Sequence, residues 1–586
     1  MPDSTVLTSR FENECGRKTL DVSLFGSIFH LHEGMKMSDF GHGVVGKREQ
    51  LFTNILPLRA TNFDFHALAK LSQDMKGAVD TVKDGPDPEE NILVPAGYTY
   101  FGQFIDHDLT FDSTSSLDPS SSSDPTNLRT PRFDLDCLYG DGPAGQPFMY
   151  DPAGEKLLFK NDPSASKKPQ DPAGQDLLRN PDGRAIIGDK RNDENSIVSQ
   201  IQFGFVRYHN AVVDALKKTD PNTWNSPGDV FESARNEVRW TYQQLVVEDF
   251  LPRIVRAEVL DNLQGKTADG RAKNYALYTW DKRSNLPREF VAAAYRFGHS
   301  GVRTGYRLNA DLANRFSIFP ASNVDTKVPG AKSLLGFDPV TNNQVIDHWE
   351  RFFPDSLPGV LPTEDRSKAA GDNPDGSVRL QFAYKIDPTL VDPLGVLPRV
   401  QVAGEGTTEQ AIALTGPLPD KKGKPPRPSL ALLNLLRGNS YRIQSGQAFV
   451  RALRDKGLPS NLLDHKHLAI RRPGSKDGTF KFKTIAKELL DETPLWFYIL
   501  AEAQAPIVDV IGSPQFDETR LLNGIGAKTQ LGWVGGRIVA EVFYGLLDSD
   551  SESYVNAAPL GWKPILGGNK NVIVRNLLKI ADPSKA

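Results

Sequence analysis

The sequence predicts a mainly α protein, built as a single large helical domain with long irregular loops and little β structure. Several segments space their apolar residues as one face of a helix does. No internal repeat and no alternation of strands with helices is present. The stretches between the helical segments, above all 141–183 and 355–429, are rich in Gly, Pro, Asp and Lys, which is typical of loops and insertions.

The predicted helices follow one another along the chain. In the first of them, Tyr98, Phe101 and Ile105 lie at positions i, i+3 and i+7, so one face is apolar. Pro287 suits the first turn of a later helix, where its missing N–H costs nothing. The last two are apolar over a broad face and therefore belong to the core. Helices are expected within 95–112, 188–216, 285–303, 429–453, 494–504 and 531–547.

Composition and charge restrict the class of protein. The hydrophobic content of 39% and the charged content of 24% are those of a soluble globular chain. The 69 Lys and Arg against 73 Asp and Glu give a net charge of −4 without a basic block, which argues against nucleic acid or an anionic membrane as a main partner. The sequence contains no run of about 18 apolar residues, so no membrane-spanning helix is expected.

The beginning of the chain and its two cysteines bear on localisation. The first residues lack a basic segment followed by an apolar one, so no classical signal peptide is expected. Cys15 and Cys137 cannot form a disulfide framework, and no C-x-x-C motif offers a zinc or iron–sulfur site. We expect a cytoplasmic protein by default, with export by a non-classical route left open.

The first helix concentrates polar residues with chemical potential. Gln103 and His107 are four apart and share a helix face, and Asp106 and Asp108 flank the histidine. Burying two acids around one imidazole is costly unless other groups pair with them. A solvated helix end with a satisfied histidine is the simpler alternative.

A proline-interrupted segment after this helix carries oxygen ligands at short spacing. Thr130, Asp134 and Asp136, with the main-chain carbonyl of Arg132, offer the hard oxygen atoms that Ca²⁺ prefers. Together with Asp108 they make a five-ligand calcium site drawn from two segments. The alternative is an acidic loop that is merely solvated.

Three later segments carry further candidates. Arg191 and Glu194 lie three apart at the start of a helix, where capping and a local ion pair explain them equally well. His299 follows small residues that leave room for a flat, bulky group near the backbone, although most lone histidines of this kind are packed core residues. Asn434 and Arg437 lie three apart beside leucines.

Four motifs in order, GQFIDHD, GDKRNDEN, YRFGHS and LNLLRG, resemble the animal-type haem peroxidases of the peroxidase–cyclooxygenase superfamily, and specifically a bacterial-style member. The likeness covers about residues 90–550 and includes LWFYILAEAQ and VGGRIVAEVFYGLL. It implies a catalytic domain at 91–550, an N-terminal extension at 1–90 packed on it, and a C-terminal extension at 551–586.

The resemblance also implies roles for individual residues. His107 would be the distal histidine, with Gln103 placing water or a halide and Arg191 as the distal arginine. His299 would be the proximal ligand of the haem iron, with Asn434 accepting a hydrogen bond from its second nitrogen. The haem would be haem b or an ester-modified haem. Its other implied contacts are Asp106 and Glu194, as ester-forming carboxylates, and Arg437 near a propionate. The implied calcium ligands are Asp108, Thr130, Arg132, Asp134 and Asp136, the last replacing a serine that is usual in vertebrate members.

The sequence departs from the family pattern at two informative positions. Asn195 stands where myeloperoxidase has the methionine of its sulfonium link, so no third covalent bond to haem is expected. Cyclooxygenase-like enzymes place a radical-forming tyrosine three residues before the proximal histidine, but here that residue is Arg296 and the tyrosine is Tyr295.

The resemblance therefore implies a haem peroxidase that reduces hydrogen peroxide and oxidises small aromatic donors or (pseudo)halides through an oxoferryl intermediate. A haem-dependent fatty-acid dioxygenase is the alternative within enzymes. A non-catalytic adhesion or structural protein on the same scaffold is the alternative of another class. The oligomeric state does not follow from the sequence.

Overall fold

The structure is a computed structural model. It describes residues 50–77, 89–111, 125–161, 175–219, 224, 226–264, 274–278, 285–309, 315–319, 333–354, 380–395, 429–472, 481–511, 528–567 and 573–581. Cys15 and the first part of the predicted N-terminal extension lie outside these ranges.

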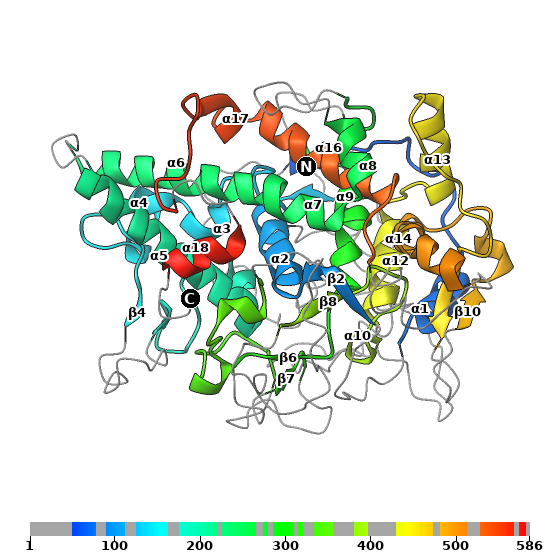
Figure 1. Cartoon of the computed structure of the whole chain (residues 1–586), viewed down its shortest axis with the longest axis horizontal. Coiled ribbons are helices and arrows are strands. Elements are labelled where there is room, and N and C mark those ends of the chain that lie inside the picture. Colours follow the sequence, from blue (N-terminus) through cyan, green and yellow to red (C-terminus); the bar gives the residue numbers. More distant parts are fainter. Residues whose placement is uncertain are drawn as a thin grey trace, which may run out of the picture.

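The helix α2 (Gly97–Leu109) runs through the middle of the molecule, as Figure 1 shows. It packs against α5 (Ser196–Thr219) through aromatic rings: Phe104 and Phe205 stack with centroids 4.9 Å apart. Tyr242 of α6 (Pro227–Gln244) meets both rings edge-on. Such ring pairs add specificity to the burial of apolar area, so they set the rotation of α2 about its axis.

The other helices surround this centre. α18 (Val574–Ala581) packs on α5, and a π-helical turn (Leu245–Phe250) joins α6 to α7 (Leu251–Ile254). The 3₁₀ helix η7 (Ala294–His299) follows α9 (Arg288–Ala292) and contacts α2, α14 and α16. The remaining α-helices are α1 (Phe65–Asp74), α3 (Asp136–Tyr139), α4 (Gly142–Gly145), α8 (Ala257–Leu263), α10 (Asp392–Gly395), α12 (Leu430–Ser440), α13 (Gly446–Asp455), α14 (Leu495–Ile511), α16 (Gly535–Ser549) and α17 (Tyr554–Ala557). Short 3₁₀ helices lie at Pro147–Met149, Lys190–Asp193, Asn342–Gln344, Trp349–Arg351 and Lys487–Leu489.

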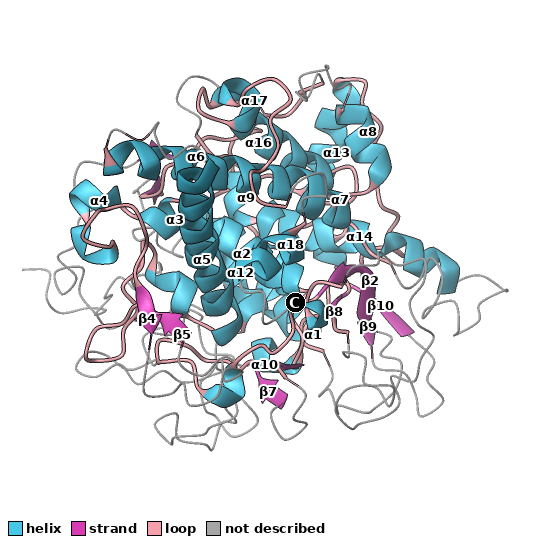
Figure 2. Cartoon of the chain, turned by 60° about the vertical axis from the view of Figure 1, so that its left-hand side comes forward, coloured by secondary structure: helices cyan, strands magenta, loops and turns pink. Residues whose placement is uncertain are grey.

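The described strands form only two-stranded antiparallel sheets, short pieces that Figure 2 shows below and beside the helices. The pairs are β1 (Gln50–Leu51) with β3 (Thr126–Asn127), β2 (Glu90–Pro95) with β8 (Phe382–Tyr384), β4 (Phe159–Asn161) with β5 (Gln175–Leu177), β6 (Gly305–Arg307) with β7 (Arg315–Ser317), and β9 (Ala469–Arg472) with β10 (Lys481–Thr484). The predicted fold class, mainly α with little β, is confirmed.

Several close approaches tie distant segments together. A Cβ added at Gly446 would lie 2.0 Å from the Tyr498 ring, so only glycine lets α13 approach α14 here. Asn91 Nδ2 donates to the Thr529 carbonyl at 2.8 Å, over a sequence separation of 438 residues. Among the described helices, none combines the length and apolar character that a membrane span requires. The proposed domain boundaries stay a prediction.

Candidate haem site

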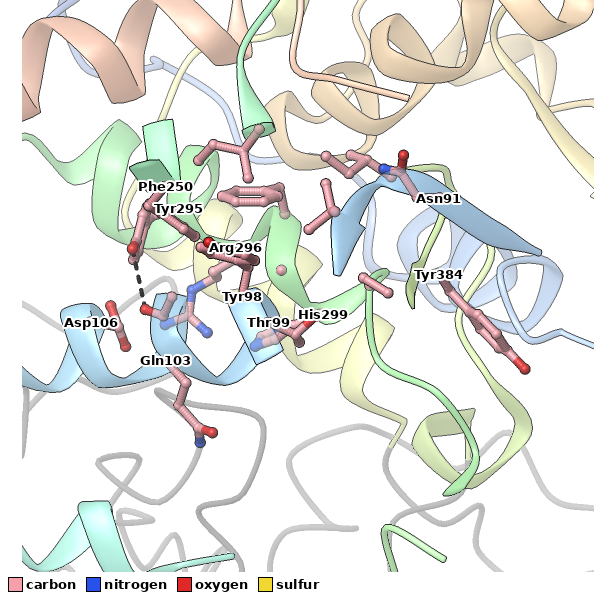
Figure 3. Close-up of a pocket in the computed structure, with 18 residues that line it drawn as sticks. Asn91, Tyr98, Thr99, Gln103, Asp106, Phe250, Tyr295, Arg296, His299 and Tyr384 are labelled. Carbon is pink, nitrogen blue, oxygen red and sulfur yellow. Dashed lines mark hydrogen bonds between the residues drawn. The ribbon is translucent and has the colours of Figure 1, made fainter. Parts of the chain in front are cut away.

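A cavity of about 680 Å³, counting its open mouth, lies between α2 and the segment that carries His299. Its lining is largely apolar and includes the polar side chains of Asp106, Arg296 and His299. Figure 3 shows Tyr295 and Arg296 on the cavity side of α2, whereas the Gln103 amide points from the opposite side of the helix.

His299 ends η7, and its ring lies against two side chains behind it. Its Nδ1 is 2.6 Å from Asn434 Nδ2, and Arg296 Nη1 donates to Asn434 Oδ1 at 3.1 Å. The family resemblance implied that the asparagine oxygen faces the histidine, but here that oxygen accepts from Arg296, whose guanidinium has donors only. Burial, and then the charge of Arg296, holds the pKa of His299 well below its usual value. The imidazole is therefore neutral.

A second cluster lies on the other side of α2, around His107. The ring is fully buried, with Nδ1 at 2.7 Å from Asn192 Oδ1 and Nε2 at 3.6 Å from Glu194 Oε1. Gln103 Nε2 donates to the same Glu194 oxygen. Burial first, and the charge of Arg191 second, lowers the pKa of His107 to about 3. The structure thus brings together three of the predicted site residues, His107, Gln103 and Glu194, although His107 is not among the residues that line the cavity.

Arg191 lies behind this cluster and holds the end of α2. Its Nη2 donates to the carbonyls of His107 (3.0 Å) and Thr110 (2.5 Å), and to the Asp189 carboxylate (2.7 Å). Burial would raise the pKa of Asp189, but Arg129 and Arg191 outweigh it and hold that pKa well below its usual value. Arg191 is therefore held by its ion pair with Asp189, and it is not among the cavity-lining residues. Its catalytic role stays a prediction.

Four of the five predicted calcium ligands, Asp108, Thr130, Asp134 and Asp136, lie close together. Carboxylate oxygens of Asp108, Asp134 and Asp136 lie within 4.8 Å of one another. Thr130 Oγ1 donates to Asp134 Oδ2 at 2.8 Å. Within the described residues, neither oxygen of the buried Asp108 accepts a hydrogen bond of ordinary geometry. Burial, then the charges of Asp134 and Asp136, raises the pKa of Asp108 well above its usual value. Three converging acids of this kind suit a hard cation.

Asp106 and Arg437, two other residues predicted to contact haem, belong to α2 and α12. Asp106 lines the cavity and accepts from Thr110 Oγ1 at 3.1 Å. Burial raises the pKa of Asp106, and the charges of Arg191 and Arg296 oppose that rise. Arg437 is buried with its guanidinium over the Tyr441 ring, 5.4 Å from its centroid.

Sequence reasoning missed four members of these clusters: Asp189, Asn192, Gln202 and Arg296. Asn192 Nδ2 donates to Gln202 Oε1, in the second turn of α5, at 2.9 Å. Asp189 and Asn192 belong to the GDKRNDEN motif, so the motif itself was the available signal. Gln202 carries no signal of its own, because a glutamine in a helix is usually exposed.

The residues around the cavity fit a haem group. His299 is a neutral imidazole on the cavity wall, the form that binds iron. A Cβ added at the preceding residue, Gly298, would meet no atom within 4 Å, so the backbone there borders open space. The cavity lining is mostly apolar, which suits the faces of a porphyrin.

Comparisons with known proteins agree with this reading. Residues 117–347 match the family model described as animal haem peroxidase. Dual oxidase 2 of Sus scrofa is 25% identical over 284 residues, 45% of this chain and 17% of that protein. Alpha-dioxygenase PIOX of Pisum sativum is 29% identical over 175 residues, 30% of this chain and 22% of that protein. The alignments thus span less than a quarter of either relative.

A crystal structure of a variant of Oryza sativa fatty acid alpha-dioxygenase, solved with palmitic acid, has a similar fold. The TM-score is 0.51 at 15% identity, over 92% of this chain and 82% of that chain. At this identity the likeness concerns the fold. With the family match and the site geometry, it supports one assignment. Residues 117–347 belong to an animal haem peroxidase domain.

Proposed function

We propose that the protein is a haem peroxidase that uses hydrogen peroxide to oxidise small aromatic donors or (pseudo)halides. One observation carries the proposal: a buried, neutral His299 faces a cavity that α2 borders on the other side, and the other ring nitrogen of His299 is held by Asn434 at 2.6 Å. When bound, the haem iron would supply the redox chemistry that splits the O–O bond of peroxide.

His299 would bind the iron through Nε2, which requires its proton on Nδ1. The oxygen of Asn434 has two lone pairs, so after an amide rotation it can accept from both this N–H and Arg296. A neutral amide behind the ligand pushes less electron density to the metal than a carboxylate would, and the cationic Arg296 strengthens that difference. The arrangement favours a strongly oxidising site.

On the distal side His107 would move the proton. A neutral imidazole can take a proton from one peroxide oxygen and return it to the other. Asn192 fixes the ring through Nδ1, and Arg191 fixes the backbone of the same residue. Asp106 and Glu194 would hold the haem edge, either as free acids or as esters.

A calcium ion would act by position. Asp108 adjoins His107, so a cation shared with Asp134 and Asp136 would tie the distal helix to the 130–136 segment. Thr130 and the carbonyl of Arg132 would complete the ligand set.

The direct experiment is an absorption spectrum of the protein reconstituted with haem. We expect a Soret band that shifts on addition of hydrogen peroxide. In His299→Ala we expect a changed Soret spectrum, because the proposed iron ligand is missing. Halogenation of monochlorodimedone with chloride, bromide, iodide and thiocyanate, and oxidation of a phenol, then define the donor. A wild-type protein that binds no haem would refute the proposal.

A fatty-acid dioxygenase is the second candidate, because alpha-dioxygenases are among the relatives and Tyr295 lines the cavity. The Tyr295 hydroxyl donates to the Gly102 carbonyl at 3.1 Å. Oxygen uptake with palmitate or linoleate in the absence of peroxide would favour this activity. Loss of that uptake in Tyr295→Phe, with haem binding intact, would assign the tyrosine to it.

A further inference from the structure

Arg129 joins the predicted calcium site to the carboxylate that anchors Arg191. Its Nη1 lies 3.1 Å from Asp136 Oδ1, and its Nη2 lies 2.5 Å from Asp189 Oδ2. Arg191 Nη2 donates to the same Asp189 oxygen at 2.7 Å. Acidic and basic side chains therefore alternate along one continuous set of contacts, which we call the charge chain: Asp136, Arg129, Asp189 and Arg191.

The charge chain is shielded from water. The most exposed of its four side chains, that of Arg129, is 14% exposed. Water and salt therefore screen these charges only weakly, and a change of charge at one end is felt along the chain. The charge of Arg129 already reaches the distal helix. Burial first and Arg191 second lower the pKa of His107 to about 3, and Arg129 adds to that effect.

The two backbone segments that Arg129 joins are packed against each other. Asp189 N donates to the Cys137 carbonyl at 3.0 Å. A Cβ added at Gly188 would lie 2.4 Å from the Asp136 carbonyl oxygen, so this close approach requires glycine. Arg129 Nη2 also donates to the Gly188 carbonyl at 3.1 Å. The charged groups thus stay within reach of one another, and small shifts in their pairing are enough to couple them.

The acidic end of the charge chain is where a cation competes with Arg129. Asp136 lies with Asp108 and Asp134 in the predicted calcium site. In the part of the chain that the structure describes, neither oxygen of the buried Asp108 accepts a hydrogen bond of ordinary geometry. A cation held by these carboxylates would share the Asp136 carboxylate with Arg129. Because the two positive charges repel each other, the cation would weaken the pair between Arg129 and Asp136.

The other end of the charge chain shows a second competition. Arg129 Nη2 and Arg191 Nη2 both donate to Asp189 Oδ2. When a cation weakens its other ion pair, Arg129 takes a larger share of this oxygen, so Asp189 holds Arg191 less tightly. Arg191 Nη2 also donates to the His107 carbonyl at 3.0 Å. The change therefore reaches the backbone of the residue that is proposed to move the proton.

We propose that Arg129 is a positioning residue that couples calcium binding to Arg191, so that the cation loosens the hold of Asp189 on this arginine. The inference rests on the proposed haem peroxidase function and on its calcium site. Coupling between two sites is reciprocal in binding free energy. If calcium loosens Arg191, then removal of Arg191 tightens calcium binding. This reciprocal effect is measured without peroxide and without turnover.

The first test measures calcium binding in Arg129→Gln. The Kd for Ca²⁺ is obtained by isothermal titration calorimetry of the full chain after a chelator has removed bound metal. We expect a Kd about tenfold or more below that of the wild type, because a positive charge that repels the cation is gone. Loss of a residue that merely braced the site would raise the Kd instead. Arg235→Gln, in a partly exposed pair with Glu232, is the control and should stay within about twofold.

A double-mutant cycle tests the rest of the charge chain. Arg191→Gln should lower the calcium Kd about threefold or more, because Asp189 then pairs with Arg129 alone. Asp189→Asn cuts the chain, so Arg191→Gln in that background should change the Kd by less than about twofold. This cycle contains no Arg129 variant, and it decides the question even if Arg129→Gln does not fold.

Three results would overturn the inference. These are a calcium Kd that is unchanged or raised in Arg129→Gln, an equal effect of Arg191→Gln with and without Asp189→Asn, and a wild-type chain that binds no calcium. If such a wild-type chain still shows a Soret band that responds to peroxide, the haem function stands. A chain with the expected calcium coupling but without a Soret band would refute the haem function alone.

Discussion

Replacing Arg191 by alanine distinguishes a catalytic guanidinium from an anchoring one. The side chain is 4% exposed and joins three partners: the Asp189 carboxylate and the carbonyls of His107 and Thr110. Arg191→Ala would leave both carbonyls at the end of α2 without this donor and would leave Asp189 paired only with Arg129. We therefore expect the variant to lose stability as well as activity.

The size of the loss follows from these contacts. Removing one partner of a buried ion pair costs about 3–5 kcal/mol. The lower end applies, because Arg129 still pairs with Asp189. Unfolding entropy is about 2.1 cal/mol/K per residue, so over 586 residues a loss of about 3 kcal/mol lowers Tm by roughly 2–3 °C. Arg235 of α6, in a partly exposed pair with Glu232, is the matched control, and Arg235→Ala should cost about 1 kcal/mol or less.

Calorimetry of both variants, with stopped-flow mixing of the haem-loaded protein with peroxide, checks the prediction. Arg191→Ala should show a lower Tm than Arg235→Ala and slower spectral change with peroxide. An unchanged Tm with slow peroxide chemistry would mean that the guanidinium points into the cavity. Normal rates with a lowered Tm would leave it a purely structural role.

Three further predictions follow from buried groups. Burial lowers the pKa of His209 to about 4, against about 6.5 unfolded, so the unfolded chain alone takes the proton as pH falls from 6.5 toward 4, and stability drops by about 3 kcal/mol. The free energy of unfolding, measured by urea titration at pH 7 and pH 5, should therefore fall less between these pH values in His209→Gln than in the wild type. An equal fall in both proteins would contradict this prediction. Gly336→Ala should destabilise the protein by about 1–3 kcal/mol or prevent folding, since its Cβ would overlap the Asp193 carbonyl, and a normal melting curve would count against this packing. Prolonged chelation should lower Tm and haem occupancy if calcium joins Asp108 to Asp134 and Asp136, whereas absence of metal in elemental analysis would exclude the ion.

The helical class was predictable because the spacing of apolar residues is visible in a short stretch of sequence. In α2 the residues with that spacing, such as Tyr98, Phe101 and Ile105, are the ones buried in the core. The convergence of Asp108 with Asp134 and Asp136 could also be predicted, because carboxylate oxygens are typical ligands of a hard cation. The structure places these groups together from two separate segments, and the calcium itself stays a prediction.

What the sequence did not reveal is which atom faces which. The competition between Arg296 and His299 for the Asn434 oxygen depends on side chains 138 and 135 residues from that asparagine. Arg191 donates to the backbone carbonyls of His107 and Thr110 at the end of α2. Every residue has such a carbonyl, so the sequence does not indicate which of them a side chain will contact. Such partners are decided by how helices rotate against each other, here by the aromatic rings between α2 and α5.

The hydrogen bond between Asn91 and Thr529 has a consequence for synthesis on the ribosome. At about 5–20 residues per second, a wait of roughly 20–90 s separates emergence of the two partners, whose positions differ by 438 residues. During that interval β2 lacks the contact with the later chain that Thr529 provides. We expect nascent molecules to need chaperone shielding there, and insertion of the cofactor to be among the last events of maturation.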